Sequence, residues 1–176
     1  MKSYRKSLFI AYLVGTILLG IDFLTKSIAN TQLPFQERVD TALPFLSWFL
    51  TYNTGYHFIF GNIANQKIWA IFGIALVAFL CFSLSRSLIK EKESRSNIVI
   101  LSIILSLIIG AAGNVLEVLI KGHATDFFLF HPFPWPSNLC DQYINAIIYI
   151  MLPITIIKSI LDWRQSKRKM KKSTSE

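Results

Sequence analysis

The sequence predicts an all-α membrane protein with four transmembrane helices, and two observations carry this prediction. First, 53% of the 176 residues are hydrophobic and only 16% are charged, whereas a soluble domain carries about 25% charged residues. Second, the hydrophobic residues form four stretches that each reach the roughly 20 residues needed to cross a bilayer. These stretches are residues 8–28, 68–89, 97–120 and 141–161. No repeat, flexible linker or second compositional block interrupts residues 1–176, so we expect a single integral membrane domain.

The distribution of positive charge predicts how the spans are oriented in the membrane. The 18 Lys and Arg residues gather before the first stretch, between the second and third, and after the fourth. The exceptions are Lys26, Arg38, Lys67 and Lys121. Because segments rich in Lys and Arg stay in the cytoplasm, we expect both termini there, including a basic tail over residues 162–176. The net charge of +8 then indicates contact with anionic membrane lipids rather than with nucleic acid.

The N-terminus has the basic residues and the apolar run of a secretion signal. Asp22 and Lys26 interrupt this run, and no small-residue cleavage site follows it. We therefore expect an uncleaved first span.

The segment between the first two stretches, residues 29–67, is too long for a simple connector. Residues 43–60, LPFLSWFLTYNTGYHFIF, are aromatic and β-prone. Large side chains on alternate sides of residues 45–52 predict a strand. Trp and Tyr favour the headgroup level of a membrane, so we expect a β-rich extracytoplasmic segment close to the lipid surface.

Polar residues of the spans and outer loops are all placed toward the outer side of the membrane. They are Asp22, Lys26, Asn53, Asn114, Glu117, Asp126, Asn138 and Asp141. Each one taken alone could be a helix cap or a side chain that reaches the headgroups. Because ionisable residues at membrane depth are costly and tend to face a functional interior, eight on one side favour a shared site.

Asp126 and Asp141 are the candidate catalytic pair. They bracket a segment whose Pro132, Pro134 and Pro136 exclude a helix. Asp141 begins the fourth stretch, where a helix N-terminus favours an ionised carboxylate. Two neighbouring carboxyl groups share one proton, which allows one to activate water while the other protonates a carbonyl. The alternatives are a simple N-cap at Asp141 and an exposed loop aspartate at Asp126.

Five motifs resemble those of signal peptidase II, the lipoprotein signal peptidase family, and they follow the family's order. The family patterns DxxTK, NxGxxF, GxxGN, VxDF and FNxAD correspond to DFLTK at 22–26, NTGYHF at 53–58, GAAGN at 110–114, ATDF at 124–127 and SNLCD at 137–141. Each motif alone is weak evidence, but the five together span the chain from about residue 5 to residue 160.

The resemblance implies a role for each of these residues. Asp126 and Asp141 would form an aspartyl peptidase dyad. The residues that would position the substrate or the dyad are Asn53, Gly55, Asn114 and Asn138. The residues that would support the structure of the site are Asp22, Lys26, Gly113 and Glu117. The implied substrate is a prolipoprotein that carries diacylglycerol on its lipobox cysteine and is cut just before it. The resemblance also implies an extracytoplasmic β-cradle over residues 29–67, a monomer and no cofactor.

The chain also departs from the family pattern. The family usually has GNxxDR, whereas this chain has Glu117 followed by Val118. Valine cannot replace the five-donor fork of an arginine, so we expect Glu117 to lose that partner, with Lys121 or His123 as candidates for the missing positive charge. Three further differences are His57 in the second motif and Ser137 and Cys140 in the last.

Several alternatives remain open at this point. A non-catalytic or specificity-altered paralogue that binds lipoproteins or other membrane substrates is compatible with the departures. A transporter would place charges near the midplane and break a helix there, and a lipid-phosphate enzyme would need clustered basic residues on the outer side. The three histidines lack ligand spacing, so we expect no metal site, and the different depths of Cys81 and Cys140 argue against a disulfide.

Overall fold

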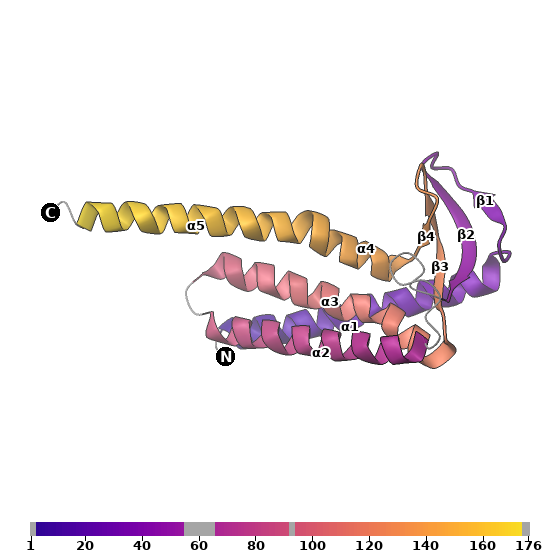
Figure 1. Cartoon of the computed structure of the whole chain (residues 1–176), viewed down its shortest axis with the longest axis horizontal. Helices are drawn as coiled ribbons and strands as arrows, with labels where there is room; N and C mark the ends of the chain where they lie inside the picture. The colour runs from indigo at the N-terminus through magenta and orange to yellow at the C-terminus, as the bar shows by residue number, and fades with distance from the viewer. Residues whose placement is uncertain (1–2, 55–65, 92–93, 174–176) are drawn as a thin grey trace.

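Four long helices dominate the computed structural model, which describes residues 3–54, 66–91 and 94–173 (Figure 1). They are α1 (Ser3–Gln32), α2 (Gln66–Lys90), α3 (Arg95–Lys121) and a fourth helix made of α4 (Leu139–Ala146), η1 (Ile147–Met151) and α5 (Leu152–Ser173). Each is long and apolar enough to cross a membrane, which confirms the four predicted spans.

Three boundaries differ from the sequence prediction by more than two residues. Helix α1 begins at Ser3 rather than residue 8 and continues to Gln32 rather than residue 28, and α5 extends to Ser173, through most of the predicted tail. These extensions contain no proline, and the tail is rich in Lys and Arg, which favour helix.

Helix α3 is the centre of the bundle, because α1, α2 and α4 all pack against it. Its contact with α1 is close: a Cβ atom added at Gly15 would lie 2.7 Å from Ile109 Cβ. Buried Ala11, Leu88 and Leu105 form the core at the end of the bundle where the N-terminus lies.

The fourth helix changes its hydrogen-bond pattern near its middle. Over η1, Leu152 N–H donates to Ile147 O, five residues back. Pro153 lies immediately beyond and has no N–H to donate to the preceding turn. Such π-turns bend helices, and α5 runs apart from α3 (Figure 1).

A four-stranded antiparallel sheet stands across the other end of the bundle (Figure 1). Its strands, in spatial order, are β1 (Arg38–Asp40), β2 (Leu46–Asn53), β3 (Ala124–Phe130) and β4 (Pro136–Ser137). The strand expected within residues 43–60 is confirmed as β2.

Half of this sheet was not predicted. Strands β3 and β4 come from the segment between α3 and α4, so two loops distant in the sequence build one sheet. The first four residues of β3, Ala124–Phe127, are all buried. A strand buried on both sides lacks the alternation by which a strand is recognised in a sequence.

A bulge in β2 adjusts the sheet beside Asp126. Trp48 pairs with Phe128 and Thr51 pairs with Asp126, so two β2 residues oppose Phe127 alone. One of the two, Leu50, is buried with Phe127 and with Ala29 of α1. This small core holds the sheet against the end of α1.

Candidate active site

Asp126 lies in β3, close to the end of α3. Gly122 terminates α3 with a positive φ of 82°, a left-handed conformation that glycine adopts without strain. The strand that follows carries Asp126 into the protein, where it is 3% exposed. Its Oδ1 accepts a hydrogen bond from Asn138 Nδ2 at 2.5 Å.

Asp141 lies in the first turn of α4, and its two oxygens accept different donors. The N-cap of the helix is Asn138 and not Asp141: Asn138 Oδ1 accepts from Asp141 N at 3.3 Å, and Asp141 Oδ2 accepts from Asn138 N at 3.0 Å. This reciprocal pair is a capping box. The other oxygen, Oδ1, accepts from Asn114 Nδ2 at 3.0 Å.

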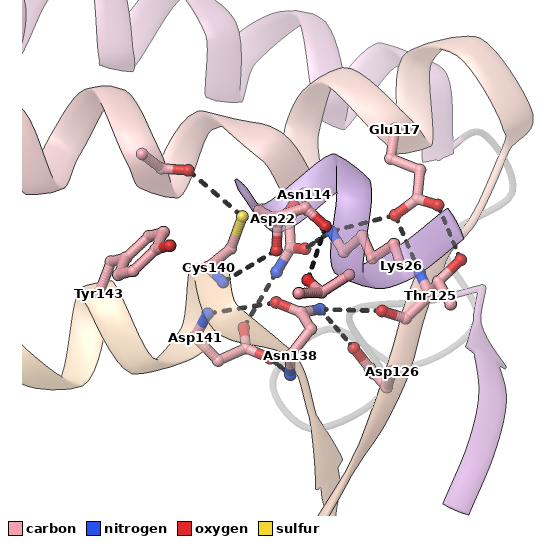
Figure 2. A network of polar contacts seen from close by, with 12 residues as sticks. Asp22, Lys26, Asn114, Glu117, Thr125, Asp126, Asn138, Cys140, Asp141 and Tyr143 are labelled. Atoms are coloured by element: carbon pink, nitrogen blue, oxygen red, sulfur yellow. Dashed lines mark hydrogen bonds and ion pairs between the residues drawn. The ribbon is translucent and has the colours of Figure 1, made fainter. Parts of the chain in front are cut away.

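Asn138 thus bonds both carboxyl groups, Asp126 through its side chain and Asp141 through its backbone (Figure 2). Burial and the nearby charge of Asp141 raise the pKa of Asp126 to about 7, although hydrogen bonds from Asn53 and Asn138 lower it. One carboxyl group that holds a proton near neutral pH beside another that accepts two N–H donors can supply both an acid and a base.

Lys26 connects the site to three neighbours at once. It is 1% exposed, and its Nζ lies 2.9 Å from Asp22 Oδ2, 3.1 Å from Glu117 Oε2 and 2.6 Å from Asn114 Oδ1. A buried cation is tolerated only with such partners. Lys26 therefore joins the polar residues of α1 to those of α3.

Glu117 has partners, contrary to the expectation that it lost one with the family's arginine. Besides Lys26, its Oε1 lies 3.1 Å from Lys121 Nζ. Thr125 donates its amide to Oε2 at 3.0 Å and its hydroxyl to Oε1 at 2.7 Å. Lys121, one helical turn beyond Glu117, supplies the charge anticipated for it, whereas His123 packs against Tyr52, with ring centroids 4.2 Å apart.

Gly113 lets three elements meet closely. A Cβ atom there would collide with the Asp22 carboxylate and lie 2.7 Å from Cys140 Sγ. Asp22 in turn accepts from Cys140 N at 3.2 Å, and the thiol donates to Gly110 O at 3.4 Å. The small residues of α3 thus admit both the polar part of α1 and the start of α4.

The second motif is only partly described. Asn53 ends β2, pairs with Ala124 of β3 and bonds to Asp126. Gly55 and His57 lie outside the described residues.

Thr125 and Asn30 belong to the site but were missed by the sequence analysis. Thr125 occupies the variable position of its motif, and Asn30 follows the first motif by four residues. Asn30 Nδ2 donates to Lys26 O at 2.8 Å, and its Oδ1 accepts from Tyr52 OH at 2.8 Å. Neither has a signal in the sequence, because the contacts with Tyr52, Glu117 and Asn138 that place them in the site arise only when separate elements come together.

Comparisons with known proteins find relatives of most of the chain. The family model described as signal peptidase (SPase) II matches residues 14–158. A lipoprotein signal peptidase of Mesorhizobium japonicum is 30% identical over 84% of this chain and 83% of its own length. One from Coxiella burnetii is 34% identical over 79% of this chain and 88% of its own length.

Two solved structures of bacterial membrane enzymes share the fold. They align with TM-scores of 0.64 and 0.66, at 19% and 21% identity, and cover 86% and 85% of this chain and 89% and 93% of their own. The chain is thus a multi-pass protein of the bacterial inner membrane with peptidase activity, and it belongs to the signal peptidase (SPase) II family.

Proposed function

We propose that Asp126 and Asp141 are the catalytic dyad of an endopeptidase that cuts prolipoproteins just before their diacylglyceryl-modified cysteine. The observation that carries this proposal is the shared contact with Asn138, which donates to Asp126 Oδ1 at 2.5 Å and to Asp141 Oδ2 at 3.0 Å. Two acids from different elements are thereby held around one residue, and the charge of Asp141 raises the pKa of Asp126, as expected for two coupled carboxyl groups.

The environments of the two acids support different roles for them in this proposal. Asp141 accepts N–H donors on both oxygens, which suits an ionised carboxylate that takes a proton from water. Asp126, with a pKa raised to about 7, holds the proton that it donates to the scissile carbonyl oxygen. The product of water attack is a tetrahedral gem-diol. When the gem-diol collapses, the C–N bond breaks and the leaving amine takes a proton from Asp141. Asp126 takes back a proton from a hydroxyl group of the gem-diol.

The position of the site supports a substrate embedded in lipid. Strand β3 and helix α4, which carry the two acids, lie where the helices meet the sheet (Figure 1). The turn between β3 and β4 exposes Phe133 and Trp135, which are 60% and 53% accessible. Aromatic side chains at the membrane interface are favourable. The sheet would lie on the outer lipid surface as a cradle, beside the acyl chains and the signal helix of the precursor.

The proposal also covers the orientation of the chain in the membrane and its oligomeric state. Both termini and the loop between α2 and α3 face the cytoplasm, since they hold most of the Lys and Arg. The protein acts as a single-domain monomer without a cofactor or metal.

A paralogue that binds lipoproteins without cutting them is the alternative raised by Val118. The pairing of Glu117 with Lys26, Lys121 and Thr125 favours a working site despite the missing arginine.

The decisive experiment compares a diacylglyceryl-modified precursor with its unmodified form, using the protein reconstituted in lipid. We expect cleavage of the modified precursor alone. Binding without cleavage would support the alternative, and equal cleavage of both would refute the proposed substrate. A Val118→Arg variant tests whether the missing arginine alters specificity. A higher cleavage rate on ordinary prolipoproteins would mean that the absence of the arginine weakens the site, and an unchanged rate would favour altered specificity.

A further inference from the structure

Thr125, the residue immediately before Asp126, is held from two sides by its own polar atoms. Its amide and hydroxyl both donate to the carboxylate of Glu117, at 3.0 and 2.7 Å. Its carbonyl oxygen accepts from Asn138 Nδ2 at 3.2 Å. Thr125, Glu117 and Asn138 are all fully buried, with 0% exposed surface. Water therefore cannot replace these partners if one of them is removed.

The contact with Asn138 links Thr125 to the acid beside it. Asn138 Nδ2 donates both to Thr125 O and to Asp126 Oδ1 (Figure 2). A displacement of the Thr125 backbone would move one acceptor of this amide and so alter its bond to Asp126. The position of Thr125 thus fixes the orientation of the Asn138 amide that donates to Asp126.

Glu117, on the other side of Thr125, is itself fixed by two helices. Lys26 of α1 and Lys121 of α3 each lie 3.1 Å from one of its oxygens. A two-point hydrogen bond to an anchored carboxylate restricts both the distance and the rotation of its partner. The helix bundle is in this way connected to the strand that carries Asp126.

We propose that Thr125 is a positioning residue for Asp126: its hydroxyl and amide grip Glu117 and hold β3 where the Asp126 carboxyl group meets Asn138. The inference rests on the proposed role of Asp126 in the dyad. It assigns a function to a side chain at the variable position of its motif, in a chain where glutamate and lysine stand in for the family's aspartate and arginine.

The hydroxyl is tested by a pair of substitutions in the full-length protein in lipid nanodiscs. Thr125→Val keeps the shape and the amide bond but leaves Glu117 Oε1 without its hydroxyl donor, whereas Thr125→Ser keeps that donor. We expect Thr125→Val to lower kcat by about 10- to 100-fold, the effect of about one to two lost buried hydrogen bonds, with KM within threefold. Thr125→Ser should recover kcat to within about threefold of the parent.

A matched control separates positioning from stability. Ser106 of α3 donates a buried hydrogen bond to Ala11 O at 3.0 Å, about 12 Å along the helix from Asn114 at 1.5 Å per residue. Ser106→Ala should lower the unfolding temperature about as much as Thr125→Val while leaving kcat unchanged. Equal loss of kcat in both variants, or none in Thr125→Val, would overturn the proposal.

A spectroscopic measurement tests the inference without cleavage. The infrared band of the protonated Asp126 carboxyl group, identified by its absence in Asp126→Asn, reports the pH at which this acid ionises. Because the hydrogen bond from Asn138 lowers the pKa of Asp126, its weakening in Thr125→Val should move the midpoint to higher pH, by at least half a unit. Thr125→Ser should restore it. An unmoved midpoint refutes the positioning role even if the protein cleaves no lipoprotein.

Discussion

Lys26 donates to Asn114 Oδ1 at 2.6 Å, and this contact decides which end of the Asn114 amide faces Asp141. With its oxygen on the ammonium, Asn114 must point its Nδ2 toward Asp141 Oδ1, 3.0 Å away. A lysine of α1 thereby orients a donor to an acid of α4 through a side chain of α3, and the arrangement suits an ionised Asp141.

Replacement of Asn114 by aspartate should therefore inactivate the site. Asn114→Asp removes the donor and places a third carboxylate beside Asp141, where like charges resist ionisation. We expect kcat to fall by at least 100-fold in the reconstituted cleavage assay. Asn145→Asp is the control, since the exposed Asn145 of α4 bonds, among the described residues, only Gln142 Oε1 at 3.3 Å. Its rate should equal that of the parent. Comparable losses in the two variants would contradict the assignment.

Loss of either acid should abolish cleavage without unfolding the protein. Asp126→Asn and Asp141→Asn keep the side-chain volume but remove the carboxyl group that exchanges protons. We expect rates at least 1,000-fold below the parent, with unchanged helix content by circular dichroism and normal membrane insertion. Ordinary turnover in either variant would exclude the dyad.

The rate should depend on the proton carried by Asp126. Its pKa is raised to about 7 by burial and by Asp141, so the acid is protonated below this pH and ionised above it. If Asp126 donates its proton to the carbonyl, kcat should fall about tenfold per pH unit well above pH 7. The measurement is a pH profile in nanodiscs, corrected for enzyme stability. A kcat that rises through pH 7 would assign Asp126 the role of base instead.

Stability should follow the same ionisation with a definite sign. The pKa of Asp126 is about 7 in the folded protein, higher than the value of about 3.9 expected in the unfolded protein. The stability that the protonated Asp126 contributes to the fold is therefore fully present below pH 4 and is lost as the pH rises through about 7. Chemical unfolding of the parent and of Asp126→Asn measures the difference. The free energy of unfolding of the variant should not show this decrease with pH. If the free energy of unfolding depended on pH in the same way in both proteins, Asp126 would not be a buried acid that is protonated in the folded state.

The two lysines on Glu117 should differ in their effect on stability. Lys26 is 1% exposed and Lys121 is 46% exposed. Lys26→Met would remove the cation beside buried Asp22 and would leave Glu117 with Lys121 alone. We expect this to cost about 3–5 kcal/mol. Lys121→Met should cost no more than about 1 kcal/mol, as for other exposed pairs. Unfolding in detergent with a chemical denaturant checks both, and equal losses would show that burial does not govern this cluster.

Gly113 should not tolerate even a methyl group. A Cβ atom there meets Asp22 and Cys140, so Gly113→Ala must push α1 or α4 away from α3. We expect destabilisation of about 1–3 kcal/mol and loss of cleavage. Gly20→Ala is the matched control on α1, since its Cβ would have no neighbour within 4 Å. A fully active Gly113→Ala variant would show that the helices adjust without disturbing the acids.

The membrane spans were accessible to sequence reasoning, because a hydrophobic stretch long enough to cross lipid is a local property. The Asn138–Asp141 box is also local, with partners three residues apart, but the sequence analysis considered Asp141 and not Asn138 as the cap. The strand β2 was equally visible through its alternating aromatics. The π-turn before Pro153 was not anticipated, because the same sequence is compatible with a regular α-helix.

The chain by itself determined which residues were available for a site: four apolar helices, with a group of acids, amides and one lysine toward one end. Only the tertiary structure decided how they pair. Asp22 bonds Cys140, which is 118 positions away, and Lys26 bonds Asn114 across 88. Such contacts depend on the close approach of three helices at Gly113 and on a sheet built from two loops. Neither can be read from the sequence, because both depend on which side chains pack together in three dimensions rather than on a local preference of the backbone.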